Sequence, residues 1–326
     1  MFNKPHRLIL IPLLASALAA CDSSNPPSSV SEYATLGAYS ADISPDGHYA
    51  VIGSQNEGGS LWDIQKNARL FDWNHRKDER SIIAESGFSP EANFAVTANQ
   101  QDLVLWHTLT GQPEWFWSSP GEILDLALAP DGNFALLGLA NHEAVYFDIK
   151  NGGILRTLRH QGRVRTVDLS ADTRTALTGS DDYKTTVWNM ESGEVMHQIT
   201  LNNVIDVVAL SPGGDKAFSA SNLDTAIIWD TQSGNILQTL SSTDGFFPQR
   251  ISYVAARFSK NGDQLLTGTA AGLIQLWDSA SGKELKRWRA HKRDPYGPTS
   301  TSIYAVGFGS GEYYAIGSNG VMNILK

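Results

Sequence analysis

The chain has 326 residues, of which 41% are hydrophobic and 18% are charged, the composition of a globular protein with a substantial core. Its 25 basic and 34 acidic residues give a net charge of −9, which makes the surface as a whole unsuited to nucleic-acid binding. One cysteine is present, so no disulfide can form within the chain.

The first twenty residues predict a secretory signal peptide. Lys4 and Arg7 form a positive start, residues 8–17 form a short apolar stretch, and Ala19 and Ala20 provide a small-residue cleavage site. The apolar stretch is too short for a membrane-spanning helix. We therefore leave residues 1–20 out of the fold, and the remaining chain has 23 basic and 34 acidic residues, a net charge of −11.

The single cysteine, Cys21, follows this stretch directly. The sequence Leu18-Ala19-Ala20-Cys21 resembles the lipobox of bacterial lipoproteins, and the resemblance implies that the Cys21 thiol is acylated and becomes the mature amino terminus. The alternative is a chance cysteine beside an ordinary signal-peptidase site. Several acyl chains would anchor the protein firmly, since one chain alone binds only marginally. The net negative charge disfavours adhesion to anionic lipid, which leaves attachment to the anchor.

Residues 21–32 are rich in serine and proline and predict a flexible polar tether. About eleven extended residues, at about 3.3 Å each, would hold the next domain up to about 35 Å from the bilayer. The lipobox resemblance implies the envelope of a Gram-negative bacterium, with the protein facing the periplasm. Asp22 resembles an inner-membrane retention residue, and the outer membrane is the alternative.

From residue 33 onward, an aromatic-ended segment recurs every 41 to 48 residues. Each copy is preceded by a turn of the type Ser-Pro-Asp-Gly, as at residues 44–47. This period and ending resemble the WD40 repeat, a four-stranded propeller blade. The resemblance implies an all-β, seven-bladed WD40-like β-propeller over residues 33–326. The segments end at Trp62, Trp106, Phe147, Trp188, Trp229 and Trp277, with a degenerate seventh at 323–325.

The two ends of the repeat region predict how the ring closes. The seventh copy stops at the end of its third strand, and residues 32–38 precede the first inner strand without an assignment. We expect residues 32–38 to form the fourth strand of blade seven. Such an N-terminal strand would remove the open sheet edges that invite aggregation.

The fourth copy has the clearest strand pattern, over residues 164–169, 175–179, 185–188 and 195–200. In WD40 proteins a histidine, a serine or threonine, an aspartate and the tryptophan form a buried hydrogen-bonded set. The matching residues here are His160, Thr178 or Ser180, Asp182 and Trp188, with Ser180 assigned as the hydroxyl. A serine, histidine and aspartate could also indicate catalysis, but these positions favour a structural role.

Motifs for catalysis, metal binding and cofactor binding are missing from the sequence. We therefore predict no enzyme activity, no metal and no cofactor. Three charged residues on the predicted inner strands, Asp42, Asp168 and Arg257, lie near the central channel. They are candidates for an ion or small-ligand site, or for ordinary ion pairs.

Three long links between blades, at residues 75–80, 243–250 and 291–298, are the best partner-binding candidates because long loops are often functional. Aromatic and arginine residues commonly anchor interfaces. Trp115 and Phe116, at otherwise polar outer-strand positions, predict a second exposed patch. The alternatives are that the loops are insertions without a function and that the two aromatic side chains only pack locally. The loop candidates are Arg76, Arg80, Phe246, Phe247, Arg250, Lys292, Arg293 and Tyr296.

These features together predict a non-catalytic, membrane-anchored periplasmic scaffold that binds a protein or peptide on its loop face. One alternative is a channel-based small-ligand sensor or enzyme. Another is an envelope or outer-membrane assembly factor, which rests on analogy between folds alone.

Overall fold

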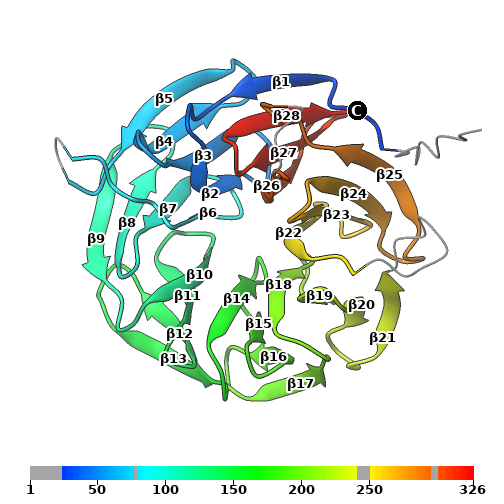
Figure 1. Cartoon of the computed structure of the whole chain (residues 1–326). Coiled ribbons are helices and arrows are strands. Elements are labelled where there is room, and N and C mark those ends of the chain that lie inside the picture. Colours follow the sequence, from blue (N-terminus) through cyan, green and yellow to red (C-terminus); the bar gives the residue numbers. More distant parts are fainter. Residues whose placement is uncertain (1–23, 77–78, 241–249, 295–299) are drawn as a thin grey trace, which may run out of the picture.

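The computed structural model describes residues 24–76, 79–240, 250–294 and 300–326, which form a closed ring of seven sheets (Figure 1). Each sheet has four antiparallel strands, ordered from the centre of the ring outward. The predicted seven-bladed propeller is therefore confirmed. Among the described residues, no helix has the length and apolar character needed to cross a membrane.

Blades one to four take up the first half of the ring. Their strands are β2 (Ala38–Ile43), β3 (Tyr49–Ser54), β4 (Gly58–Asp63) and β5 (Ala68–Trp73); β6 (Glu85–Phe88), β7 (Phe94–Ala98), β8 (Asp102–His107) and β9 (Pro113–Ser118); β10 (Ile123–Leu128), β11 (Phe134–Leu139), β12 (Glu143–Asp148) and β13 (Ile154–Arg159); and β14 (Val164–Leu169), β15 (Thr175–Ser180), β16 (Lys184–Asn189) and β17 (Val195–Thr200).

Blades five to seven complete the ring, and the last blade takes its outer strand from the N-terminal part of the chain. Their strands are β18 (Ile205–Leu210), β19 (Lys216–Ser221), β20 (Ala226–Asp230) and β21 (Ile236–Leu240); β22 (Tyr253–Phe258), β23 (Gln264–Thr269), β24 (Leu273–Asp278) and β25 (Glu284–Arg289); and β26 (Ile303–Phe308), β27 (Tyr313–Gly317), β28 (Val321–Leu325) and β1 (Ser29–Glu32).

The hydrophobic core lies between neighbouring blades. The second strands, such as β11 and β15, are almost fully buried, whereas the outer strands β13 and β17 are largely exposed. Aromatic rings pack across the seams, as where Trp73 of blade one stacks on Trp106 of blade two at 5.2 Å between ring centroids. Because neighbouring blades cover both faces of each sheet, the second strands are buried along nearly their whole length rather than at alternate residues.

The closing strand is β1, and it pairs antiparallel with β28 from Ser29 opposite Ile324 to Glu32 opposite Val321. Closure by an N-terminal strand is confirmed, but its predicted position at 32–38 is wrong. The chain turns at Tyr33, which is buried and stacks on Trp62 with 4.2 Å between ring centroids. This turn across the seam between blades seven and one ends the strand at Glu32, so the strand begins three residues and ends six residues before the predicted positions.

The predicted tether, residues 21–32, is also too long. Asn25 lies against the outer edge of β25, where its amide donates to the carbonyl of Arg287 at 2.9 Å. Its carbonyl accepts from the amide of Arg289 at 3.0 Å. The chain is thus held on the propeller from Asn25 onward. Three residues lie between Cys21 and Asn25, so a reach of about 13 Å over four residue steps replaces the expected 35 Å.

Candidate functional site

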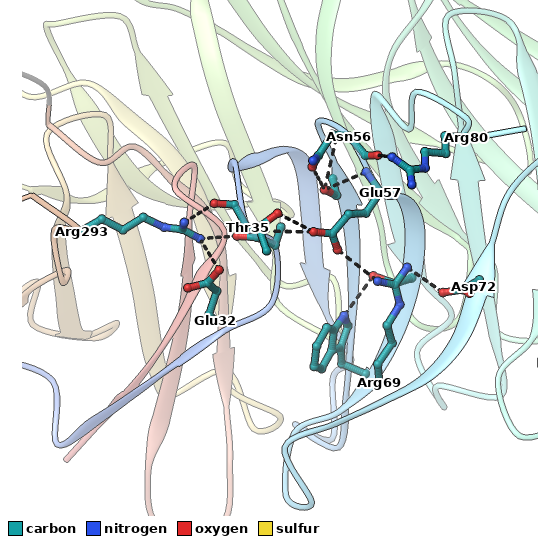
Figure 2. Close-up of polar contacts among 12 residues, drawn as sticks. Glu32, Thr35, Asn56, Glu57, Arg69, Asp72, Arg80 and Arg293 are labelled. Carbon is teal, nitrogen blue, oxygen red and sulfur yellow. Dashed lines mark hydrogen bonds and ion pairs between the residues drawn. The ribbon is translucent and has the colours of Figure 1, made fainter.

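A polar groove follows the seam where the ring closes, between β1 and the loop after β5 (Figure 2). It consists of two depressions, of about 520 and 210 Å³, which share Glu57 and Arg69. We call it the clasp groove. Its lining residues are Glu32, Tyr33, Ala34, Thr35, Glu57, Trp62, Arg69, Asp72, Asn74, Glu79 and Arg80.

Arg69 is the central cation of the clasp groove. A bulge in the pairing of β4 with β5 sets Arg69 opposite Trp62, and its guanidinium then lies between two carboxylates (Figure 2). Its Nη1 is 3.1 Å from Glu57 Oε2, and its Nη2 is 2.6 Å from Asp72 Oδ1. The positive charge of Arg69 is therefore offset within the groove.

Glu57 connects blade one to the turn that follows β1. The Thr35 hydroxyl donates to Glu57 Oε1 at 2.6 Å, and the Thr35 amide donates to the same oxygen at 3.4 Å. The Thr35 hydroxyl bond, with the Arg69 charge adding to it, lowers the pKa of Glu57 below its usual value. Glu57 is thus a carboxylate at neutral pH and holds two sides of the seam together.

Two of the predicted partner-binding arginines, Arg80 and Arg293, reach this seam from the loops after blades one and six. Arg80 Nη1 donates to the backbone carbonyl of Asn56 at 2.6 Å. Arg293 donates to the carbonyls of Ala34 and Thr35 and lies 3.5 Å from Glu32 (Figure 2). The structure therefore brings these loops together, but both guanidinium groups hold the protein's own backbone.

The other loop candidates do not bind backbone carbonyls at the seam as Arg80 and Arg293 do. Arg76 is largely exposed and lies 3.7 Å from Glu79. Lys292 is half-buried beside Arg293 in the chain, and Arg250 is exposed just before β22. Phe246, Phe247 and Tyr296 lie outside the described residues. Their roles in binding stay predictions.

The aromatic pair on β9 is exposed, by 44% at Trp115 and 56% at Phe116. The ring of His75, in the loop after β5, contacts Phe116 edge-on with 6.4 Å between centroids. Trp117 instead stacks on Phe147 of blade three at 5.7 Å. The expected apolar patch is thus present on the outer strand of blade two, next to the loop that borders the clasp groove.

A second polar set lies buried inside blade four. His160 Nε2 is 2.7 Å from the Thr178 hydroxyl, and His160 Nδ1 is 3.1 Å from Asp182 Oδ2. The indole of Trp188 donates to the same Thr178 hydroxyl at 2.8 Å. Burial lowers the pKa of His160, although Asp182 acts in the opposite direction. A neutral, enclosed histidine of this kind fits a structural role.

The assignment of Ser180 to this set is wrong, because Thr178 supplies the hydroxyl. Trp188 pairs with Ala176 in the sheet, and its indole reaches two residues along the neighbouring strand, to Thr178. Ser180 lies at the far end of that strand. Its hydroxyl instead accepts a hydrogen bond from the Asp182 amide at 3.1 Å and shapes the turn.

The bond from indole to hydroxyl recurs in other blades, which sequence reasoning missed. A hydroxyl residue nine or ten positions before the tryptophan would have identified it. In blade two the hydroxyl also contacts a histidine, His75, at 2.9 Å. The pairs are Trp106 with Thr97 at 2.8 Å, Trp229 with Ser219 at 3.1 Å, and Trp277 with Thr267 at 2.9 Å.

Comparison with known proteins agrees with this geometry. The model of the WD domain, G-beta repeat, matches residues 152–189, which contain the first three strands of blade four. The chain is a seven-bladed β-propeller with a WD40 repeat at residues 152–189. No curated protein matches it.

The channel-side charges of the propeller join its blades. Arg257 of blade six lies 2.6 Å from Asp42 of blade one and also donates to the Ile43 carbonyl. Asp42 accepts from the amide of Phe88 in blade two at 3.1 Å. The described residues contain no group of histidine, cysteine and carboxylate side chains suited to a metal. The ion-pair interpretation of these residues is therefore favoured over an ion site.

Two further carboxylates on inner strands also accept hydrogen bonds from backbone amides of the next blade. Asp125, which sequence reasoning missed, accepts from the amide of Val167 in the next blade at 2.8 Å. Asp168 accepts from the amide of Leu210 at 2.7 Å. Burial raises the pKa of Asp125 to about 7 and that of Asp168 to about 6, against the opposing effect of these amides. The carboxylates bridge adjacent blades at a cost in desolvation.

Proposed function

We propose that the propeller is a non-catalytic, membrane-anchored scaffold that faces the periplasm and docks a protein partner at the clasp groove. WD40 propellers are commonly protein-interaction scaffolds, and the WD40 match over residues 152–189 supports this role. The supporting observation is the convergence of two expanded loops on one groove, through Arg80 and Arg293. A rigid ring that presents long loops is a suitable docking surface.

The charges at the edge of the clasp groove indicate the chemistry of the partner. The side chains of Glu32, Asp72 and Glu79 are exposed by 54%, 70% and 64%. Four carboxylates line the groove against the guanidinium groups of Arg69 and Arg80, an excess of two negative charges, and Arg293 and Arg76 pair with Glu32 and Glu79 at its edge. A partner segment with lysine or arginine would complement it, and the adjacent Phe116 would provide an apolar anchor.

Charge reversal in the groove tests this docking site. We expect Asp72→Lys combined with Glu79→Lys to weaken capture of the partner at least tenfold, because like charges then face the basic segment. The partner is first identified by crosslinking in membranes and co-purification, and its affinity is then measured with purified proteins. The matched control is Glu191→Lys with Glu194→Lys, two exposed acids of blade four. Equal capture by both double variants would place the docking site elsewhere.

The membrane anchor is tested at Cys21. We expect metabolic labelling with a fatty acid to mark the wild-type protein and not the Cys21→Ser variant, because acylation requires the thiol. The variant should move from the membrane fraction to the soluble fraction, since its attachment depends on acyl chains. A soluble, unlabelled wild-type protein would contradict the anchor. Density separation of the two membranes would test the inner-membrane position that we infer from Asp22.

A further inference from the structure

One segment of this acidic chain is strongly basic. Residues 283–293 contain six of the 25 basic residues and one acid, Glu284. They comprise β25, the outer strand of blade six, and the turns on both sides of it. We call this segment the basic rim. Its basic residues are Lys283, Lys286, Arg287, Arg289, Lys292 and Arg293.

The lysines supply most of the outward charge of the basic rim. Lys283 and Lys286 are exposed, Lys292 is half-buried, and none of the three forms an ion pair with a described residue. Arg287, by contrast, is buried against Glu284, with nitrogen–oxygen distances of 2.5 and 2.7 Å. Leu285, between the lysines, is 44% exposed. The surface therefore combines ammonium groups that lack a carboxylate partner among the described residues with an exposed apolar side chain, and the ammonium of Lys286 lies 5.5 Å from the centre of the Tyr313 ring.

The chain that leads to the anchor lies on this same strand. Asn25 exchanges backbone hydrogen bonds with Arg287 and Arg289 of β25, and Figure 1 shows the N-terminal chain arriving at this edge of the ring. Three residues lie between Asn25 and Cys21, and the four residue steps span about 13 Å when extended. An acylated Cys21 would thus hold the basic rim close to the headgroups, near the range of about 10 Å over which surface charges act.

We propose that the basic rim is a membrane-contact surface that binds the anionic phospholipid headgroups around the anchor. This inference rests on the proposed anchoring through Cys21. Each lysine near an anionic surface strengthens membrane association about fivefold, although the chain as a whole carries the opposite sign. The propeller then stands edge-on, on blade six. Both faces of the ring, and the clasp groove at blade one, stay open to the periplasm.

Lysine acetylation measured by mass spectrometry tests this contact on the natural, membrane-purified protein. The protein is reconstituted into vesicles of phosphatidylcholine alone or with about 30% phosphatidylglycerol, a typical anionic surface. We expect Lys283 and Lys286 to react at least fivefold more slowly on the anionic vesicles. Raising the salt from about 0.1 M to about 0.5 M should restore their reactivity through screening. Lys150, an exposed residue of blade three, is the internal control and should not change.

The possible outcomes separate the contact from the anchor. Equal reactivity of Lys286 on both kinds of vesicle would overturn the membrane contact while leaving the anchor intact. A protein that fails to incorporate into either vesicle would instead contradict the anchor. In that case the thiol of Cys21 in the same chain is coupled to a maleimide phospholipid, and the acetylation is repeated. Protection of Lys283 and Lys286 in that experiment would support the contact independently of natural acylation.

Discussion

Replacement of Thr178 by valine is expected to lower the free energy of unfolding by about 3 kcal/mol, because a buried donor, the Trp188 indole, and a buried acceptor, His160 Nε2, both lose their partner at about 1 to 3 kcal/mol each. The Thr178 hydroxyl contacts both the His160 imidazole and the Trp188 indole. Valine has nearly the same shape, so packing changes little. Urea unfolding at neutral pH measures the loss, with the slope of the transition as a check that the same surface is exposed.

The matched control for this variant is Ser180→Ala, on the same strand. Its hydroxyl accepts one bond from the Asp182 amide, so we expect a loss of about 1 kcal/mol. The comparison decides which hydroxyl stabilises blade four. Equal losses in the two variants, or the larger loss for Ser180→Ala, would contradict the assignment of Thr178.

Arg257→Ala is expected to cost about 3 kcal/mol of stability at pH 8 and clearly less at pH 5, because removing one partner of a desolvated ion pair leaves the other charge uncompensated. Burial raises the pKa of Asp42 above its usual value, and Arg257, 2.6 Å away, opposes this rise. The hydrogen bond from Arg257 to the Ile43 carbonyl does not depend on pH, so the stability that is lost with it should be the same at both pH values. Chemical unfolding at the two pH values measures the difference.

The sign of this pH dependence follows from the raised carboxyl pKa values. Burial raises the pKa of Asp168 to about 6, above the unfolded value of about 3.9. The folded state then binds protons that the unfolded chain has released, so stability is lost as the pH rises from about 4 through 6. In the Arg257→Ala variant, protonation of Asp42 at low pH removes its uncompensated negative charge, so the variant loses less stability there. The double variant Arg257→Ala with Asp42→Asn should therefore be more stable at pH 8 than Arg257→Ala alone, and an identical penalty at both pH values would contradict this account.

Much of the fold could be predicted from local pattern. The period of aromatic-ended segments gave the correct number of blades, since each blade is built from strands adjacent in sequence and turns with their own signals. The hydroxyl bonded to Trp188 could be chosen only by comparing blades, because Thr178 lies ten positions before the tryptophan, as in blades five and six, whereas Ser180 lies eight. The pairing of Trp188 with Ala176 across the sheet gives the physical reason for this spacing.

The candidate site was predicted less well, because its contacts join residues far apart in the chain. The long loops were correctly chosen as features that depart from the repeat. Nothing in the sequence indicated that Arg293 donates to the carbonyls of Ala34 and Thr35, or that the Thr35 hydroxyl donates to Glu57. A guanidinium in a loop has the same sequence signature whether it faces solvent or its own backbone.

The sequence by itself determined the blade count, the closure by an N-terminal strand and the candidate anchor at Cys21, because these depend on repeats and motifs that are local in the chain. The tertiary structure alone decided where β1 begins, which side chains line the clasp groove, and that Asn25 lies on β25 beside the basic rim. These features depend on the ring bringing its two ends together. Ring closure makes neighbours of residues about 260 positions apart, and no local pattern encodes their register.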